Sequence, residues 1–196
     1  MFVQFIEGPV SDAQAFRQQL DRWQETCRDG ASGWLGTTAG VTADGTAFLA
    51  ARFASPEAAR ANSDRPEQSA WWDETEPLFD GPVSFEDCED VILMRDGGSD
   101  DAGFVQVIRG EVNDLEAART AFTDIPDDER PDVIGALVGL LPDGAYTMVV
   151  YFTSEDEARA AEAAAAAEAG DADPMGDLHD EPPRYLDLTE PWLWSA

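Results

Sequence analysis

The chain carries one sequence pattern twice. The segment FVQFIEG at 2–8 returns as FVQVIRG at 104–110, and the segment 47–60 matches 146–159 at a constant offset. A duplication of this kind predicts two copies of one folding unit, because any architecture assigned to the first copy must also suit the second. It constrains the fold far more than it constrains the chemistry.

The length of 196 residues suits one large domain or two small ones, and the duplication favours two. The segment DGGSDDA at 96–102 is polar, rich in Gly and Asp, and without hydrophobic periodicity, so we interpret it as a linker. The predicted organisation is a first ferredoxin-like repeat at 1–95 and a second at 103–196, for the reasons that follow.

Each repeat has the predicted element order β-α-β-β-α-β. In the first repeat, a strand at 2–7 precedes a helix whose start we assign to the capping box Ser11–Gln14. Asp44-Gly45 predicts the tight turn of a hairpin, and Ser55-Pro56 has the residue types that begin a helix. A final strand is expected over 83–94. The second repeat follows the same order with its own turn and capping residues.

This order is that of the ferredoxin-like unit, an antiparallel sheet with both helices on one face. The strand at 47–53 is nevertheless apolar on both faces, with Leu49 and Phe53 on one and Phe48 and Ala50 on the other. A sheet with two apolar faces needs a second covering layer, which the other copy can supply. The predicted fold class is therefore α+β, with two tandem ferredoxin-like βαββαβ units whose antiparallel sheets pack into an intramolecular pseudo-dimer. If each half pairs instead with a half of another chain, the protein is a homodimer.

The formal net charge of −29 and the absence of lysine are the main compositional features. Such a chain repels phosphate backbones and anionic lipids, so nucleic acid and membrane surfaces are not expected as partners. We interpret the charge as an acidic, solvated surface of the kind found in salt-adapted or high-GC organisms. Attraction of a cationic ligand or a basic protein is the alternative.

The first residues run directly into a strand pattern, without the basic region and apolar core of a signal peptide. The apolar runs are all too short to cross a bilayer. Cys27 and Cys88 are too few to form a disulfide framework or a metal site by themselves, and buried free thiols are expected, although their redox state stays open. A cytoplasmic location is predicted.

Four features carry a family resemblance: the opening strand at 2–6, the Asp44-Gly45 hairpin, the strand-to-helix junction FASPEAA at 53–59, and the helix with Trp71-Trp72. Together they resemble the dimeric α/β-barrel superfamily, and within it the antibiotic-biosynthesis-monooxygenase-like proteins. In that superfamily two copies pair sheet to sheet and close a barrel. The resemblance therefore implies a dimeric α/β-barrel-like pseudo-dimer within one chain.

Members of the monooxygenase-like branch oxidise small aromatic or polyketide substrates without metal or flavin, or degrade haem, in a pocket between sheet and helices. The resemblance implies a small hydrophobic ligand and no cofactor. The candidate substrate-binding residues are polar or aromatic side chains at the matching positions, together with their partners in the other repeat: Gln4, Arg52, Asn62, Trp72, Gln106 and Tyr151. The catalytic residues are left unassigned.

The two glutamines have a structural alternative, in which they face the seam between the sheets and bond to each other or to backbone. Trp71 and Trp72 also have one, because adjacent helical residues point in different directions and one of the two can belong to the core. Since Asn62 corresponds to Ala161, a site that uses it is asymmetric. The first repeat is therefore the favoured location.

His179 is the single histidine of the chain. It is a candidate cofactor ligand only if haem binds, and a surface or capping role is the alternative. With no second histidine and no clustered carboxylate spacing, no metal site is expected.

Two functions follow from these observations. The first is a small-ligand-binding protein of the dimeric α/β-barrel type without assured catalysis, favoured by the alanine-rich helix at 160–172, which offers little to bury. The alternative is a cofactor-independent monooxygenase that acts on a small hydrophobic aromatic or polyketide-like substrate. Its pocket would lie in the first repeat, where Gln4 and Arg52 would stabilise an oxyanion if both point inward.

Overall fold

The computed structural model describes residues 1–123, 130–169 and 178–196. The first part of the chain forms β1 (Phe2–Pro9), α1 (Ala13–Thr26), β2 (Trp34–Val41), β3 (Thr46–Phe53), α2 (Pro56–Ser63), α3 (Pro66–Thr75) and β4 (Ser84–Cys88), with short 3-10 turns at Arg28–Gly30 and Glu76–Leu78. The second part forms β5 (Asp90–Met94), β6 (Phe104–Glu111), α4 (Leu115–Thr123), β7 (Val133–Leu140), β8 (Ala145–Phe152), α5 (Glu155–Ala169), β9 (Arg184–Leu188) and β10 (Trp192–Ser195).

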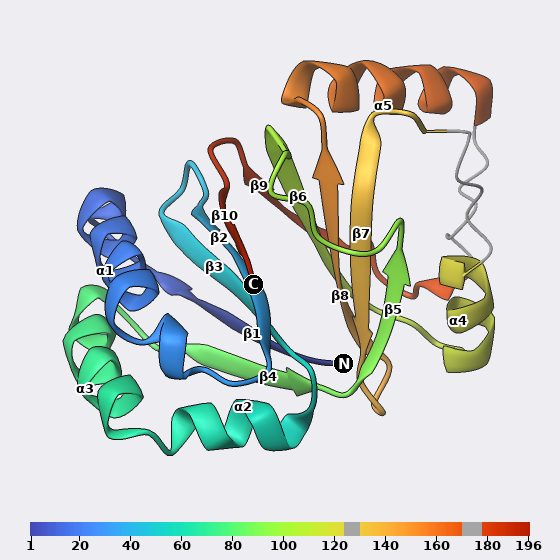
Figure 1. Ribbon diagram of the computed structural model, residues 1–196. Coiled ribbons are helices and arrows are strands. Elements are labelled where there is room, and N and C mark those ends of the chain that lie inside the picture. The colour runs from blue at the N-terminus through green and yellow to red at the C-terminus, as the bar shows by residue number, and fades with distance from the viewer. Residues whose placement is uncertain (124–129, 170–177) are drawn as a thin grey trace. The chain divides into compact units, whose positions relative to one another are not determined.

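The strands form two five-stranded sheets of the same design (Figure 1). The first has the order β10-β2-β3-β1-β4 and the second the order β5-β7-β8-β6-β9. Every neighbouring pair is antiparallel. The α+β class and the two ferredoxin-like units are thus confirmed, and the face-to-face packing of the sheets stays a prediction.

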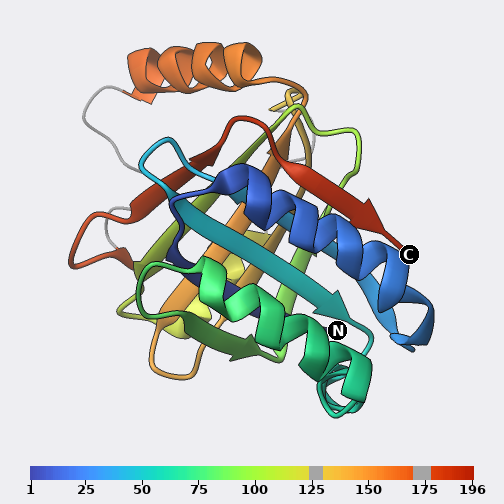
Figure 2. The same ribbon diagram turned by 90° about the vertical axis from the view of Figure 1, so that its left-hand side faces the viewer.

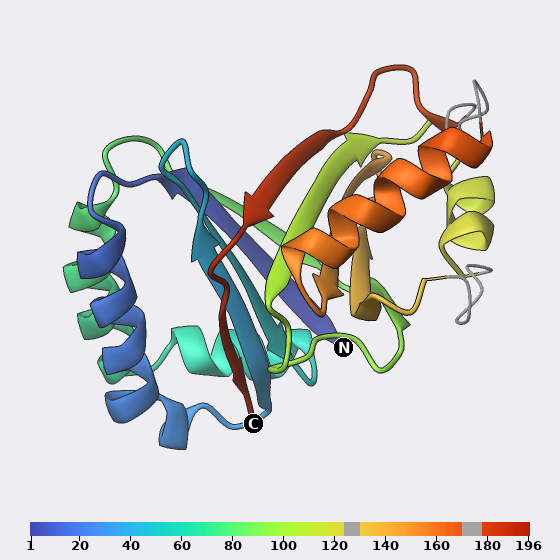
Figure 3. The same ribbon diagram turned by 90° about the horizontal axis from the view of Figure 1, so that it is seen from above.

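Helices cover one face of each sheet. Figure 2 shows α1 and α3 side by side across the first sheet, and Figure 3 shows α4 and α5 on one side of the second. In the first unit Phe16, Leu20 and Trp23 of α1 are buried against Leu49 and Phe53 of β3. This burial of apolar side chains at helical spacing is what holds α1 on the sheet.

Among the described residues, the helices of the second unit bury fewer side chains. The described part of α4 has 9 residues where α1 has 14, and it contributes the buried Ala118 and Phe122. Among the described side chains of α5, Ala158 alone is buried. The thin contact predicted for 160–172 agrees with this at 160–164 and at Ala167, and the other side chains of that segment lie outside the described residues.

The segment expected to form one final strand over 83–94 is two strands, and the single-strand prediction is wrong. Strand β4 pairs with β1 in the first sheet, whereas β5 pairs with β7 in the second. The second repeat ends in the same way, because β9 pairs with β6 and β10 pairs with β2 of the first sheet. An alternating apolar pattern predicts a strand but not the sheet edge at which it pairs.

Contacts between residues accordingly group Met1–Glu89 with Trp192–Ala196, and Asp90–Pro191 as the other unit. The repeats predicted at 1–95 and 103–196, with a linker at 96–102, remain our proposal for the limits of the duplication. The two compact units differ from those limits by one exchanged strand at each end.

The helix starts follow the chemistry of capping residues, with one correction. The cap of α1 is Asp12, whose side chain accepts from the Ala15 N–H at 2.9 Å, so the assignment to Ser11 is wrong by one residue. Ser55 caps α2 as predicted, accepting from the Ala58 N–H at 3.2 Å. Gly45 has a φ of 85°, the left-handed conformation that the predicted hairpin turn requires.

Cys27 and Cys88 are both buried, and neither is part of a disulfide. Within the described parts of the chain, no helix has the length and apolar character needed to cross a membrane.

Candidate functional site

Both units have a cavity at the same place, between the sheet and its helices. In the first unit its volume is about 70 Å³, and in the second it is about 580 Å³. The larger volume falls in the range of small-molecule sites in proteins, whereas the smaller one is a packing defect. The second unit therefore holds the candidate site.

The two cavities are equivalent residue by residue along their sheet floors. The first four pairs of floor positions are related by the repeat and the strand registers as follows: Gln4 and Gln106, Ile6 and Ile108, Trp34 and Val133, Thr37 and Ala136. The remaining pairs lie on the central strands β3 and β8: Leu49 and Met148, Ala51 and Val150, Phe53 and Phe152. Equivalent positions thus line a small cavity in the first unit and a large one in the second.

Tryptophans close the cavity of the first unit. The rings of Trp23 and Trp34 lie 5.3 Å apart between their centroids. The indole N–H of Trp23 donates to Gln68 at 2.7 Å, and that of Trp34 donates to Thr37 at 3.0 Å. Trp71 completes the wall and donates to a backbone carbonyl of α1 at 2.7 Å. Because the indole N–H of each of these three tryptophans is paired and its ring is packed, this arrangement is a satisfied core.

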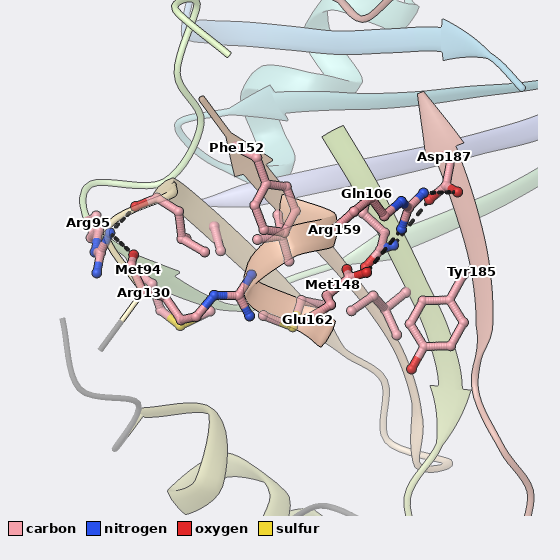
Figure 4. A pocket seen from close by; sticks show the side chains of 14 residues that line it. Met94, Arg95, Gln106, Arg130, Met148, Phe152, Arg159, Glu162, Tyr185 and Asp187 are labelled. Carbon is pink, nitrogen blue, oxygen red and sulfur yellow. Dashed lines mark hydrogen bonds and ion pairs between the residues drawn. The ribbon is translucent and has the colours of Figure 1, made fainter. Parts of the chain in front are cut away.

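The second unit lacks these rings. Val133 stands where the first unit has Trp34, and the alanine-rich α5 follows β8 in the place where α2, with α3 after it, follows β3. The resulting cavity has an apolar floor that includes Ile108, Met148, Val150 and Phe152 (Figure 4). Such a surface can hold a ring system.

One end of the cavity carries a hydrogen-bonded chain of four residues. Gln106 on β6 donates through Nε2 to Oδ1 of Asp187 on β9 at 3.1 Å. Arg159 on α5 bonds to the other carboxylate oxygen, Oδ2, and also to Glu162 at 3.2 Å. Burial opposes the charged form of Arg159, but its bonds to Glu162 and Asp187 outweigh this and hold the pKa of the guanidinium above its ordinary value. Figure 4 shows Gln106, Arg159 and Asp187 together.

An ion pair between Arg130 and Asp132 lies at the other end of the cavity. Arg130 makes two bonds to the carboxylate of Asp132, at 3.0 Å from Nε and 2.7 Å from Nη2. This hydrogen bonding raises the pKa of Arg130 against the effect of burial, and it lowers the pKa of Asp132. Arg95 donates to the backbone carbonyls of Arg130 and Val133, so it ties β5 to the start of β7.

The bond between Gln106 and Asp187 has an equivalent in the first unit, where Gln4 donates to Asp87 at 2.7 Å. In both cases the two residues are directly opposite on neighbouring strands. The alternative in which the glutamines bond to each other or to backbone is therefore wrong. The matching Asp87 and Asp187 were a signal in the sequence that could have identified these partners.

The predicted site residues do not converge on one cavity. Gln4 and Asn62 line the small cavity of the first unit, and Gln106 lines the large one. Trp72 lines a separate groove of about 330 Å³ that also includes Gln4 and the exposed Phe85. Asn62 is engaged by Gln68 at 3.2 Å and by Arg65 at 3.0 Å.

Arg52 and Tyr151 lie on the sheet faces away from the helices. Gln4 is opposite Ala51 in the register and Arg52 is opposite Val3, so Gln4 and Arg52 point to opposite faces of the first sheet. The oxyanion site predicted from Gln4 and Arg52 is therefore not formed. Tyr151 is fully buried, one position from the cavity residues Val150 and Phe152.

His179 lies outside the large cavity. Its Nε2 is 3.0 Å from the hydroxyl of the buried Tyr146, and the two rings are 5.6 Å apart. The described residues contain no group of His, Cys, Asp or Glu side chains placed to hold a metal ion. A role for His179 as a haem ligand stays a prediction.

Comparison with known proteins extends these observations. No protein-family model matches the chain, and no curated protein matches it in sequence. Solved structures do match over nearly its full length. A candidate monooxygenase from Fusobacterium nucleatum subsp. nucleatum has a TM-score of 0.78 at 9% identity, covering 99% of this chain and 94% of that one.

A candidate monooxygenase from Lactobacillus acidophilus has a TM-score of 0.66 at 9% identity, covering 99% of each chain. This chain shares the fold of the dimeric α/β-barrel superfamily. An anthrone oxidase-like protein is also similar, with a TM-score of 0.62 at 11% identity over 98% of this chain and 93% of that one. The resemblance inferred from the sequence is thereby confirmed for the fold, in the tandem form.

Proposed function

We propose that the second unit binds a small, largely apolar ligand in the cavity between its sheet and α5. The observation that carries this proposal is the difference between equivalent cavities, about 580 Å³ in the second unit and about 70 Å³ in the first. The lining of this space is mostly apolar, and an apolar floor that is left open to water is unfavourable. A ligand that fills the space covers that floor.

The lining suits a ligand with a ring system and a few polar groups. The floor is aliphatic and aromatic, with Met94 and Met148 as adaptable side chains. Polar groups are confined to the ends, where Gln106 and Arg159 stand at one and Arg130 at the other. Ligand sites of this kind take affinity from the apolar floor and orientation from the few polar groups.

The equivalent residue of the first unit suggests a substitution that tests this proposal. The substitution Val133→Trp copies Trp34 of the first unit into the cavity, and Val133→Ile is the matched control that adds little volume. The neutral dye N-phenyl-1-naphthylamine, which fluoresces in apolar surroundings, should bind the native chain and the Ile variant. The Trp variant should bind at least about tenfold more weakly, because the indole occupies the ring site. Equal binding by the Trp variant, with its fold intact by circular dichroism, would show that the dye sits elsewhere.

The second candidate function is a cofactor-independent monooxygenase for a small aromatic or polyketide-like substrate. It is supported by the names of the structural relatives, two candidate monooxygenases and an anthrone oxidase-like protein. Gln106 and Arg130 would be the groups near a substrate oxygen. The two carboxylates that line the cavity, Glu162 and Asp187, both accept hydrogen bonds from Arg159. Neither carboxylate is therefore left unpaired to act as a general base.

Anthrone is a suitable substrate for a direct test. In its oxidation one O₂ is consumed, one oxygen atom becomes the new carbonyl, and the other leaves as water with the two hydrogens of the methylene carbon. The oxygenase predicts O₂ uptake and anthraquinone formation in a ratio of one to one, in the presence of a chelator. Uptake no faster than with the Val133→Trp variant would exclude this activity and leave the binding function.

A further inference from the structure

The side chain of Gln106 is held in one orientation by its partner. The carboxylate of Asp187 can only accept hydrogen bonds, so the amide nitrogen of Gln106 must be the group that faces it, at 3.1 Å. Asp187 is in turn fixed by Arg159, which bonds to its second oxygen. The amide of Gln106 therefore has no freedom to exchange its nitrogen and oxygen.

This orientation leaves the amide oxygen of Gln106 as the end that is open to a ligand. Gln106 is 5% exposed and lines the large cavity. Among the described residues its Oε1 has no hydrogen-bond partner. This oxygen is not among the fully buried side-chain atoms that lack a partner, so it keeps some accessible surface. A buried acceptor that adjoins an open cavity is a point at which a ligand can bind through a donor.

We propose that Gln106 makes the cavity selective for ring ligands that donate a hydrogen bond, through a hydroxyl or N–H group, at the end next to β9. Asp187 and Arg159 are positioning residues that hold the amide so that it presents an acceptor. The inference rests on the proposed ligand-binding function of the same cavity.

The chemistry explains the direction of the selectivity. A hydroxyl donor completes the bonding of Oε1, whereas an ether or carbonyl at the same place puts two acceptors against each other and leaves both without a partner. Sites built to pair with a ligand donor discriminate against analogues that lack it, because the protein group is then desolvated without compensation.

The pair 1-naphthol and 1-methoxynaphthalene isolates this difference, since the two share a ring system and differ in the donor. Dissociation constants are measured by equilibrium dialysis. For the native chain we expect naphthol to bind about tenfold more tightly, the typical effect of one hydrogen bond to a buried group. In Gln106→Leu the ratio of the two constants should fall to about one.

Two further variants separate positioning from simple structural support. Asp187→Asn gives Gln106 a partner that can both donate and accept, so the amide can turn and the ratio should fall while both ligands still bind. Gln4→Leu removes the equivalent glutamine of the first unit, which faces the closed cavity, and should leave the ratio unchanged.

The outcomes distinguish the two proposals. If both ligands bind the native chain with equal affinity and both are lost in Val133→Trp, the cavity binds ligands but the inference about Gln106 is overturned. If neither ligand binds the native chain more tightly than Val133→Trp, the proposed binding function itself fails. A ratio that survives Gln106→Leu also overturns the inference, because another group must then provide the selectivity. The ratio in the native chain stands as a test even if a variant does not fold.

Discussion

Val133 occupies in the second unit the position that Trp34 occupies in the first. Both residues open the strand that follows the first helix of their unit, and both are aligned in the register with the last Phe of the next strand, Phe152 and Phe53. This one difference, together with the alanine-rich sequence of α5, accompanies a change in cavity volume from about 70 to about 580 Å³.

The exchange of these two residues should have unequal effects on stability. Trp34→Val removes a buried ring and leaves the hydroxyl of Thr37 without its indole donor, so the free energy of unfolding should fall by about 2–4 kcal/mol. Val133→Trp fills open space and should cost less than about 1 kcal/mol. Urea unfolding of both variants measures the difference. Equal losses would mean that the cavity of the second unit is not available to a side chain.

The carboxylate of Asp132 should make stability depend on pH in the acid range. Its hydrogen bond from Arg130 lowers its pKa in the folded state below the ordinary value of 3.8. The unfolded chain therefore binds the proton first, and the contribution of Asp132 is present above about pH 5 and lost as the pH falls through the folded pKa. Asp132→Asn should be less stable than the native chain at neutral pH, and the two should converge as the pH falls through the folded pKa. A constant difference across this range would contradict the assignment.

The net charge of −29 should make the chain more stable at high salt. Repulsion among the carboxylates opposes the compact state. At 0.1 M, salt screens this repulsion between exposed charges that lie more than about 10 Å apart. Raising NaCl from about 0.01 M to about 1 M should increase Tm by about 3 °C or more, which corresponds to about 1 kcal/mol in a chain of this size. A fall in Tm would show that the surface ion pairs outweigh the repulsion. Calorimetry at constant pH is the measurement.

Trp192 should stabilise the first unit although it lies near the end of the chain. It is buried on β10, which pairs with β2, and the centroid of its ring lies 6.3 Å from that of Phe16 on α1. Trp192→Ala should cost about 3–5 kcal/mol, and amide exchange should accelerate first in the sheet that contains β2. Trp194→Ala, on the same strand but only partly buried, is the control and should cost less. Faster exchange confined to the second sheet would contradict the pairing.

The duplicated pattern was enough to predict the two ferredoxin-like units, because apolar alternation, turn residues and capping residues are local signals that agreed in both copies. The exchange of β5 and β10 between the sheets was not predictable in this way. Whether a strand pairs at one sheet edge or another depends on contacts between distant segments, and the alternation of side chains is the same in both cases.

The site was only partly predictable. Gln106 was identified because a polar residue repeats within an apolar strand. Trp72 was selected as a pocket wall, but neighbouring tryptophans fill the first cavity and Trp72 lines a different groove. Sequence identifies bulky residues without showing whether they surround a space or occupy it. Arg130 and Arg159 were missed because ion-paired arginines have no pattern that separates them from surface charges.

The exchanged edge strands have a consequence for how the two copies can evolve. Each sheet is completed by an edge strand that the other half of the gene encodes. Strand β5 lies in the first repeat and pairs in the second sheet, and β10 lies in the second repeat and pairs in the first sheet. Deletion of either copy would therefore remove an edge strand from the sheet of the copy that remains, so we expect the two copies to be inherited as a pair.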